Sequence, residues 1–159
     1  MEKKKKMLVL IRIASGILLC AYLAFIARRM FFHAYGSYYR TYSASPEYNL
    51  IPFKTIASLI MDYKYYELEV WIYNLFGNLA AFAPLGFLLP LALGAGKKLT
   101  ATVSFSLVLL FAAEAAQLVF RVGVFDVDDI MLNITGVLAG YMLYGLVWKK
   151  GRAIRQSYE

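Results

Sequence analysis

Residues 99–120 read LTATVSFSLVLLFAAEAAQLVF, and this stretch decides the fold class because Glu114 is its single charged side chain. A transmembrane helix needs about 20 mostly apolar residues to cross about 30 Å of hydrocarbon. Further stretches that meet this length lie at residues 7–27, 71–93 and 129–148. The sequence therefore predicts an all-α polytopic membrane protein, a four-helix transmembrane bundle that forms one domain over residues 1–159.

The composition supports this class. Hydrophobic residues make up 61% of the chain, charged residues 17%, and the mean hydropathy is +0.58, whereas a soluble domain is about 45–50% apolar and about 25% charged. A soluble globular enzyme is nearly excluded. A single Cys and 4 Pro exclude disulfide-stapled and collagen-like folds. The net charge of +7 lies at the edges of apolar segments, which is typical of membrane anchoring, so we expect no nucleic-acid partner and no cofactor.

The basic residues predict the orientation of the bundle. Short connections at residues 94–98 and 121–128 require antiparallel helix pairs. Four spans then place on one side the lysines at residues 3–6, the pair at residues 97–98 and the basic residues after the last span. Because positively charged loops stay in the cytoplasm, we expect a cell-membrane protein with both termini cytoplasmic and an outer loop at residues 28–70.

This outer loop contains the pattern of a short amphipathic helix. After Pro52, which can open a helix, apolar side chains recur at Ile56, Leu59, Ile60 and Tyr63. Such a helix would lie at the outer membrane surface or dip into it. It would either cap the bundle or form the lid of a site.

Polar side chains recur in three of the spans. A charge near the bilayer centre costs roughly 2.5–3.5 kcal/mol, so Glu114 needs an explanation. Gln117 and Arg121 follow Glu114 at i+3 and i+7, and Arg121 is the natural partner of Glu114 or of the nearby aspartates. We expect an outward-opening polar pocket that binds a ligand but no metal, with the candidate residues Asn74, Asn78, Glu114, Gln117, Arg121, Asp126, Asp128, Asp129 and Asn133.

Two alternatives apply to this cluster. The polar residues could form a buried hydrogen-bonded network that fixes helix register without binding anything, and the aspartates at residues 126–129 could cap the fourth helix.

Pro84 and Gly86 are expected to interrupt the second helix just below Asn78. Gly136 and Gly140 form a small-xxx-small pair, which predicts close helix packing.

Four motifs then resemble the successive signatures of the VanZ-like membrane proteins. They are Asn49-Leu-Ile-Pro-Phe53, Asn78-x3-Phe82-x-Pro84-Leu85-Gly86-Phe87, Glu114-x2-Gln117-x3-Arg121, and Asp126-Val-Asp128-Asp129-x3-Asn133-x2-Gly136. The resemblance covers nearly the whole chain and implies a bacterial host. The founding member of this family is associated with resistance to teicoplanin, a glycopeptide that carries a fatty acyl chain, and the resemblance implies a similar role here.

Three functions are compatible with these features. The first is a non-enzymatic protein whose outer pocket binds an amphiphile, namely a lipid-linked cell-wall precursor, another membrane lipid or the lipoglycopeptide itself. The second is an intramembrane enzyme in which Glu114 acts as acid or base on a lipid-linked envelope substrate. The third is a structural or assembly subunit. We favour binding over catalysis because the sequence has no recognisable Ser-His or Cys-His pair.

Overall fold

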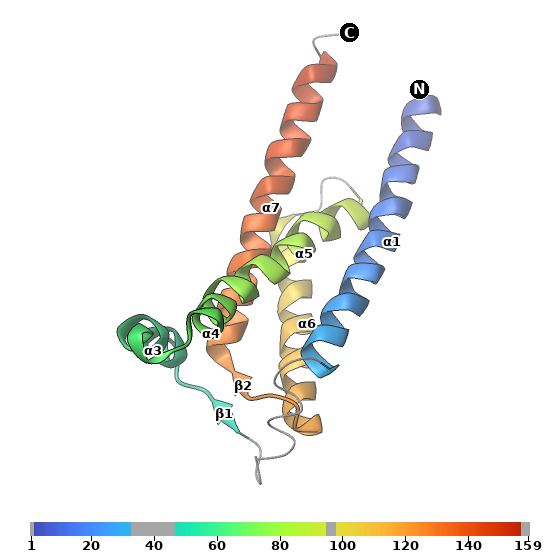
Figure 1. Cartoon of the computed structure of the whole chain (residues 1–159). Coiled ribbons are helices and arrows are strands. Elements are labelled where there is room, and N and C mark those ends of the chain that lie inside the picture. The colour runs from blue at the N-terminus through green and yellow to red at the C-terminus, as the bar shows by residue number, and fades with distance from the viewer. Residues whose placement is uncertain (1, 33–46, 95–97, 157–159) are drawn as a thin grey trace.

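Four helices are long and apolar enough to cross a membrane, and they account for most of the computed structural model (Figure 1). The structure describes residues 2–32, 47–94 and 98–156. The candidate spans are Lys5–Phe32, Asn74–Ala92, Leu99–Phe120 and Val127–Trp148. The predicted all-α membrane bundle is therefore confirmed.

The elements follow one another with short connections. In chain order they are α1 (Glu2–Phe32), β1 (Tyr48–Asn49), α3 (Lys54–Met61), the 3-10 turn η1 (Tyr63–Tyr65), α4 (Leu68–Ile72), the π-helical segment η2 (Tyr73–Gly77), α5 (Asn78–Ala92), α6 (Leu99–Phe120), β2 (Phe125–Asp126) and α7 (Val127–Gln156). Helix α3 is the predicted amphipathic helix of the outer loop.

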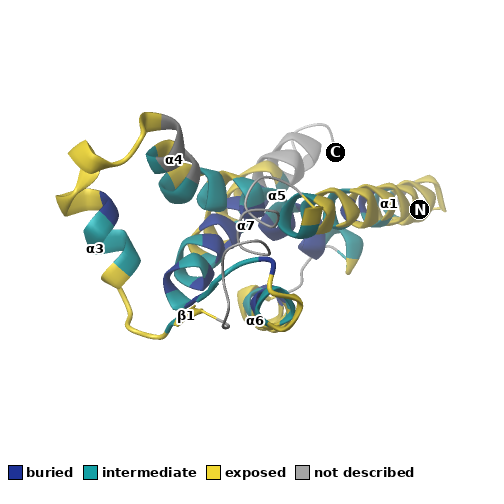
Figure 2. Cartoon of the chain, turned by 60° about the horizontal axis from the view of Figure 1, so that its bottom comes forward, coloured by how far each residue is buried: buried dark blue, intermediate teal, exposed yellow. Residues whose placement is uncertain are grey.

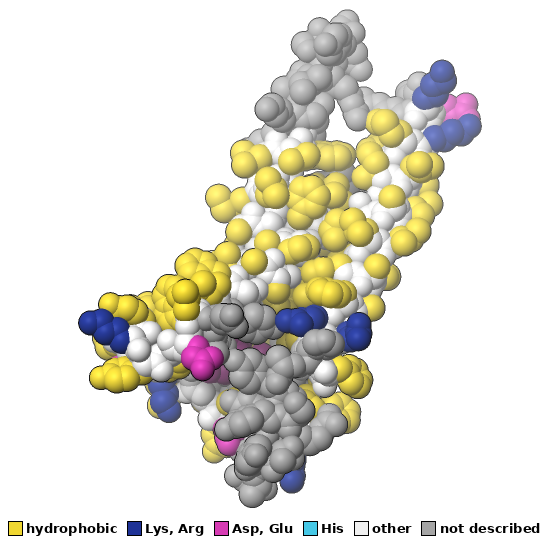
Figure 3. All heavy atoms as spheres, in the orientation of Figure 1, with side chains coloured by type: hydrophobic (Ala, Val, Ile, Leu, Met, Phe, Trp, Pro, Cys, Tyr) yellow, Lys and Arg dark blue, Asp and Glu magenta, His cyan; other side chains and the backbone are white. Residues whose placement is uncertain are grey.

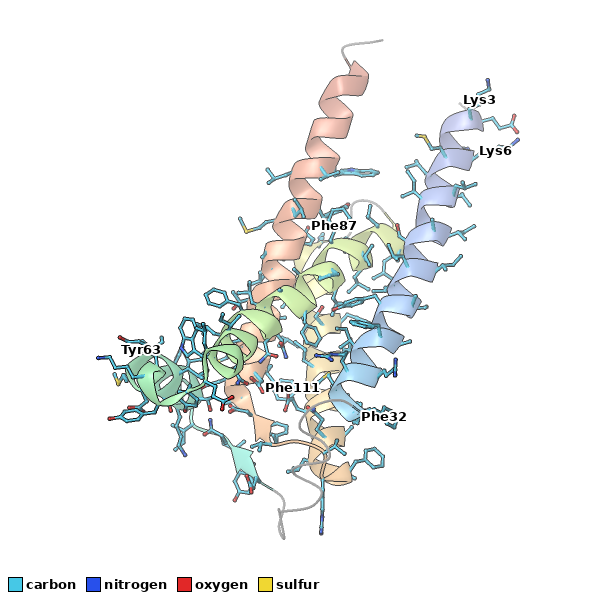
Figure 4. The ribbon with its side chains drawn as sticks, in the orientation of Figure 1. Lys3, Lys6, Phe32, Tyr63, Phe87 and Phe111 are labelled. Carbon is cyan, nitrogen blue, oxygen red and sulfur yellow. The ribbon has the colours of Figure 1, made fainter. Side chains whose placement is uncertain are left out.

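The two ends of the molecule differ. The start of α1 and the end of α7 lie together at one end, which we call the termini end, while β1, β2 and α3 lie toward the other, which we call the strand end (Figure 1). Lys3 and Lys6 mark the termini end of α1, and Phe32 marks its opposite end (Figure 4). Both ends of the chain lie at the same end of the bundle, as expected for an even number of spans (Figure 1).

Helix α5 is the centre of the bundle and packs against both α7 and α1. Glycines allow α5 and α7 to approach closely, because a Cβ added at Gly86, Gly136 or Gly140 would overlap a backbone carbonyl oxygen of the facing helix. The packing role predicted for Gly136 and Gly140 is confirmed. Buried residues concentrate at this crossing (Figure 2).

The predicted interruption at Pro84 and Gly86 is wrong. Helix α5 runs through Pro84 and Pro90, and Gly86 instead serves the contact with α7. The irregularity lies before α5, in the π-helical segment η2. A proline inside a membrane helix is tolerated when neighbouring groups accommodate the freed carbonyl. A π-helical segment carries extra residues per turn and occurs often at functional sites.

Other boundaries shift by a few residues. Helix α6 has the predicted bounds, whereas α7 begins at Val127 rather than at residue 129. Helix α1 continues to Phe32, so Arg28 and Arg29 belong to its last turns and not to the outer loop. The helical segment of the second span already starts at Leu68. Residues 33–46 of the predicted outer loop lie outside the described residues.

Large apolar side chains cover the outward faces of the helices (Figure 3). Examples of exposed ones are Leu10 on α1, Val108 on α6, and Met142 and Leu146 on α7. A soluble protein rarely exposes continuous apolar surfaces of this kind. They are the surfaces that lipid chains would cover.

Candidate functional site

A short parallel strand pair brings two distant motifs together at the strand end. Strands β1 and β2 place Tyr48 opposite Phe125 and Asn49 opposite Asp126. The Phe125 N–H also donates to the Glu47 carbonyl oxygen, at 3.1 Å. The Asn49–Phe53 motif therefore lies directly beside the aspartate motif that opens α7.

Asp128 caps a helix that belongs to another part of the chain. Its Oδ1 accepts from the backbone N–H of Phe53 at 2.6 Å, and its Oδ2 accepts from the N–H groups of Thr55 at 2.8 Å and Ile56 at 3.1 Å. Phe53 has a left-handed backbone, with φ of 65°, and provides no side-chain cap for α3 itself. The buried Asp128 carboxylate fills this role, and a helix N-terminus favours the negative charge.

Asp126 organises the residues around this contact. Its Oδ1 accepts from Asn49 Nδ2 at 3.1 Å and from the Asp128 N–H at 2.8 Å, and its Oδ2 accepts from Thr55 Oγ1 at 2.6 Å. The bond to the Asp128 N–H is a cap on α7. The expected capping by these aspartates is therefore divided: Asp126 caps α7 whereas Asp128 caps α3. We call the group formed by Asn49, Thr55, Asp126 and Asp128 the α3 latch.

Glu114 lies behind the α3 latch on α6. Only 2% of its surface is exposed, and its Oε2 accepts one hydrogen bond, from the Asp126 N–H at 3.3 Å. The residue that donates this bond is itself an acid, and Asp128 and Asp129 follow it at the start of α7. Glu114 is thus a buried carboxyl group in acidic surroundings.

Asp129 and Asn133 extend this polar region along α7. Asp129 Oδ1 accepts from Asn78 Nδ2 at 2.6 Å, which joins α7 to the start of α5. Asn133 is one turn further along α7 and is 2% exposed, and its Oδ1 has no hydrogen-bond partner among the described residues. We call Glu114, Asp129 and Asn133 the acceptor site.

Three predicted site residues have other surroundings. Arg121 is exposed at the end of α6, and within the described ranges it forms no ion pair with Glu114 or an aspartate. The helical spacing fails there because Arg121 is left-handed, with φ of 54°. Gln117 Nε2 donates to the Met30 carbonyl oxygen of α1 at 3.4 Å. Asn74 is half-buried within η2, just before Asn78.

Sequence reasoning missed two contributors to the α3 latch and one anchor of α3. Asn49 belonged to a recognised motif but received no role, and nothing in the sequence marked Thr55. Trp71 Nε1 donates to the Leu59 carbonyl oxygen at 2.7 Å, which fastens the middle of α3 to α4.

Two further buried polar groups and one depression lie outside this region. The hydroxyls of Thr102 and Ser106 also lack partners in the described part of the chain, but they are about 18 and 12 Å along α6 from Glu114, toward the termini end. A surface depression on α1 is lined by Ala24, Ala27, Arg28, Phe31 and Phe32. None of these residues belongs to the predicted ligand site.

The fold and the site define a multi-span helical membrane protein with an acidic region at the start of its last span, where α3 is attached. The model of the VanZ/LLP1 family matches residues 17–148. The chain therefore belongs to the VanZ/LLP1 family, in agreement with its four motifs. Searches of the curated proteins and of the solved structures found no match.

Proposed function

We propose that the chain is a cell-membrane protein with both termini in the cytoplasm and the strand end facing outward. Counted along the sequence, the segments assigned to the side of the termini contain ten basic residues: Lys3, Lys4, Lys5, Lys6, Lys97, Lys98, Lys149, Lys150, Arg152 and Arg155. The segments assigned to the other side contain six: Arg28, Arg29, Arg40, Lys54, Lys64 and Arg121. The excess of positive charge favours a cytoplasmic position for the termini end.

In this orientation, the acceptor site binds the head group of an amphiphile from the outer leaflet. The observation that carries this proposal is that two buried side chains in the bundle receive few hydrogen bonds. Among the described residues, Glu114 accepts one long hydrogen bond and Asn133 Oδ1 accepts none. A buried polar group without a partner costs free energy. Ionisable residues inside membrane proteins mark binding sites or transport paths more often than struts.

The α3 latch attaches α3 to the start of α7, next to the acceptor site, and in this proposal α3 lies at the depth of the lipid head groups. Helix α3 and η1 expose apolar side chains, including Met61 at 81% and Tyr65 at 90%. Tyr63 lies on the same segment (Figure 4). Amphipathic segments of this kind lie in the membrane interface, with aromatic rings at the head-group level. Asp126 and Asp128 would then hold α3 at the interface, while the acceptor site holds the ligand.

The resemblance to VanZ-like proteins, whose founding member is associated with teicoplanin resistance, supports a role of this binding in glycopeptide resistance. The amphiphile would be a lipid-linked cell-wall precursor, another membrane lipid, or the acylated drug itself. Binding of any of these would alter what an acylated glycopeptide meets at the membrane surface.

Growth assays test the resistance role. Cells that express the wild-type chain should tolerate more teicoplanin than empty-vector cells, with no gain against a glycopeptide that lacks an acyl chain. Glu114→Gln should remove the gain, and Asp62→Asn, which changes an exposed carboxylate outside the site, should retain it. Equal tolerance of wild-type and empty-vector cells would reject the role in resistance.

A mass-spectrometric inventory of co-purifying lipids tests the binding itself. The purified wild-type chain should retain an amphiphile that Glu114→Gln retains less well, while Asp62→Asn should match the wild type. Identical lipid inventories for all three proteins would contradict amphiphile binding at the acceptor site.

A further inference from the structure

The acceptor site and the α3 latch differ in how their acids are satisfied. Asp128 accepts three backbone N–H groups, and Asp126 accepts from Asn49, Thr55 and the Asp128 N–H. The carboxylates of the α3 latch therefore have donors from the protein. Their charge holds α3 in place and is not left for a ligand.

The acceptor site has few donors of its own. The Asp126 N–H serves Glu114 and the Asn78 amide serves Asp129. No other hydrogen bond to Glu114 or Asp129 occurs within the described ranges, and Asn133 Oδ1 receives none. The site thus offers oxygen acceptors from α6 and α7 that need donors from elsewhere.

The charges point the same way. The hydrogen bonds from the Asp126 N–H to Glu114 and from the Asp128 N–H to Asp126 bring Glu114 next to the start of α7, where three aspartates lie within four residues, so acids are near neighbours of the acceptor site. Arg121, the arginine that follows Glu114 at i+7, is exposed and forms no ion pair with these acids within the described ranges. A bound cation would favour the ionised form of these acids, whereas a phosphate or carboxylate would add a further negative charge beside them.

We propose that the head group held at the acceptor site carries a protonated amine, an inference that rests on the proposed function. An ammonium group has three donors and no acceptor. It therefore complements the Glu114 and Asp129 carboxyl oxygens together with Asn133 Oδ1, and its positive charge compensates the acids. The amine can belong to a membrane phospholipid or to an acylated peptide.

Native mass spectrometry of the full chain in detergent tests the class of ligand. One pair of probes is phosphatidylethanolamine and its N-acetylated form, which has the same chains and phosphate but no charged amine. A second pair is the myristoylated amides of lysine and of norleucine. The amine-bearing member of at least one pair should bind about tenfold more tightly than its partner, the scale expected for a charged hydrogen bond. Preference in the first pair identifies a lipid amine, and preference in the second identifies a peptide amine.

Variants connect the preference to the site. Glu114→Gln and Asn133→Leu should each lower the ratio of affinities between the amine-bearing probe and its partner toward 1. Asp62→Asn should leave this ratio unchanged. Asn133→Leu guards against loss of folding, since it removes a buried acceptor that has no partner among the described residues. Melting curves of each variant verify that the bundle is intact.

The outcomes separate the two proposals. If both members of each pair bind equally and Glu114→Gln weakens them all, the amine inference fails and amphiphile binding stands. If binding of every probe is independent of Glu114 and Asn133, the proposed function fails and the inference fails with it. An amine preference that survives in both variants also overturns the assignment to this site.

Discussion

The Asp128 carboxylate accepts a hydrogen bond of 2.6 Å from the backbone N–H of Phe53, a residue 75 positions earlier in the chain. This bond fixes the start of the amphipathic helix α3 to the start of α7, a candidate membrane span. It also explains why the chain needs both the Asn49–Phe53 motif and the Asp126–Asp129 motif. Each supplies one half of the α3 latch, and neither can position α3 alone.

Replacement of Asp128 should release α3 from the bundle. Asp128→Ala leaves three backbone N–H groups without their acceptor, so we expect the free energy of unfolding to fall by about 2 kcal/mol. Asp128→Asn retains one acceptor oxygen and should fall between alanine and wild type. Thermal unfolding in detergent measures both. Asp62→Ala is the control at an exposed aspartate, and an equal loss in the control would contradict the capping role.

Adding a single methyl group where α5 and α7 cross should lower the stability of the bundle. A Cβ at Gly140 would overlap the Ala83 carbonyl oxygen, so Gly140→Ala should destabilise the bundle by about 2 kcal/mol through overpacking. Gly145 is the matched control on the same helix because nothing lies within 4 Å of a Cβ added there. Gly145→Ala should be neutral or stabilising by up to about 1 kcal/mol. Melting temperatures that fall equally would contradict close packing at Gly140.

The apolar spans were predictable because their signal is local. Helix α6 begins and ends where predicted, since a long apolar run is bounded by Lys98 and Arg121. The spacing of Gly136 and Gly140 also predicted that another helix packs closely against α7, although it did not identify that helix as α5. By contrast, nothing local marks the π-helical segment at Tyr73–Gly77. Pro84 predicted an interruption in α5, whereas the irregular segment precedes α5.

The sequence indicated which polar residues recur in the spans but not which contacts they make. The spacing argument for Arg121 assumed a helix that continues through residue 121, whereas its left-handed conformation ends α6 and leaves the side chain exposed. The donors to Asp128 are backbone N–H groups, which have no side-chain signature. No pattern in the sequence could therefore divide the aspartates between the α3 latch and the acceptor site.

Cysteine labelling in intact cells should reveal the orientation of the bundle. In a Cys20→Ser background, a membrane-impermeant maleimide should label Tyr65→Cys, which replaces a residue that is 90% exposed near α3 at the strand end. Lys3→Cys, at the termini end, should react only after the cells are permeabilised, because the basic side is expected in the cytoplasm. The opposite labelling pattern would place the acceptor site on the cytoplasmic face and reject its contact with the outer leaflet.

Asn133→Leu should separate stability from function. The described chain provides no donor for Asn133 Oδ1, so replacing this side chain by an apolar one of similar size removes a desolvation cost and should raise the free energy of unfolding by about 1 kcal/mol. The same change should weaken retention of co-purified amphiphile, since it removes one acceptor of the acceptor site. Thermal unfolding and lipid mass spectrometry on the same preparation measure both. A variant that unfolds more easily would instead mark Asn133 as part of a structural network, as expected of an assembly subunit. Residues at functional sites commonly lower the stability of a protein. A variant with a higher free energy of unfolding and less bound amphiphile would show this trade-off at Asn133.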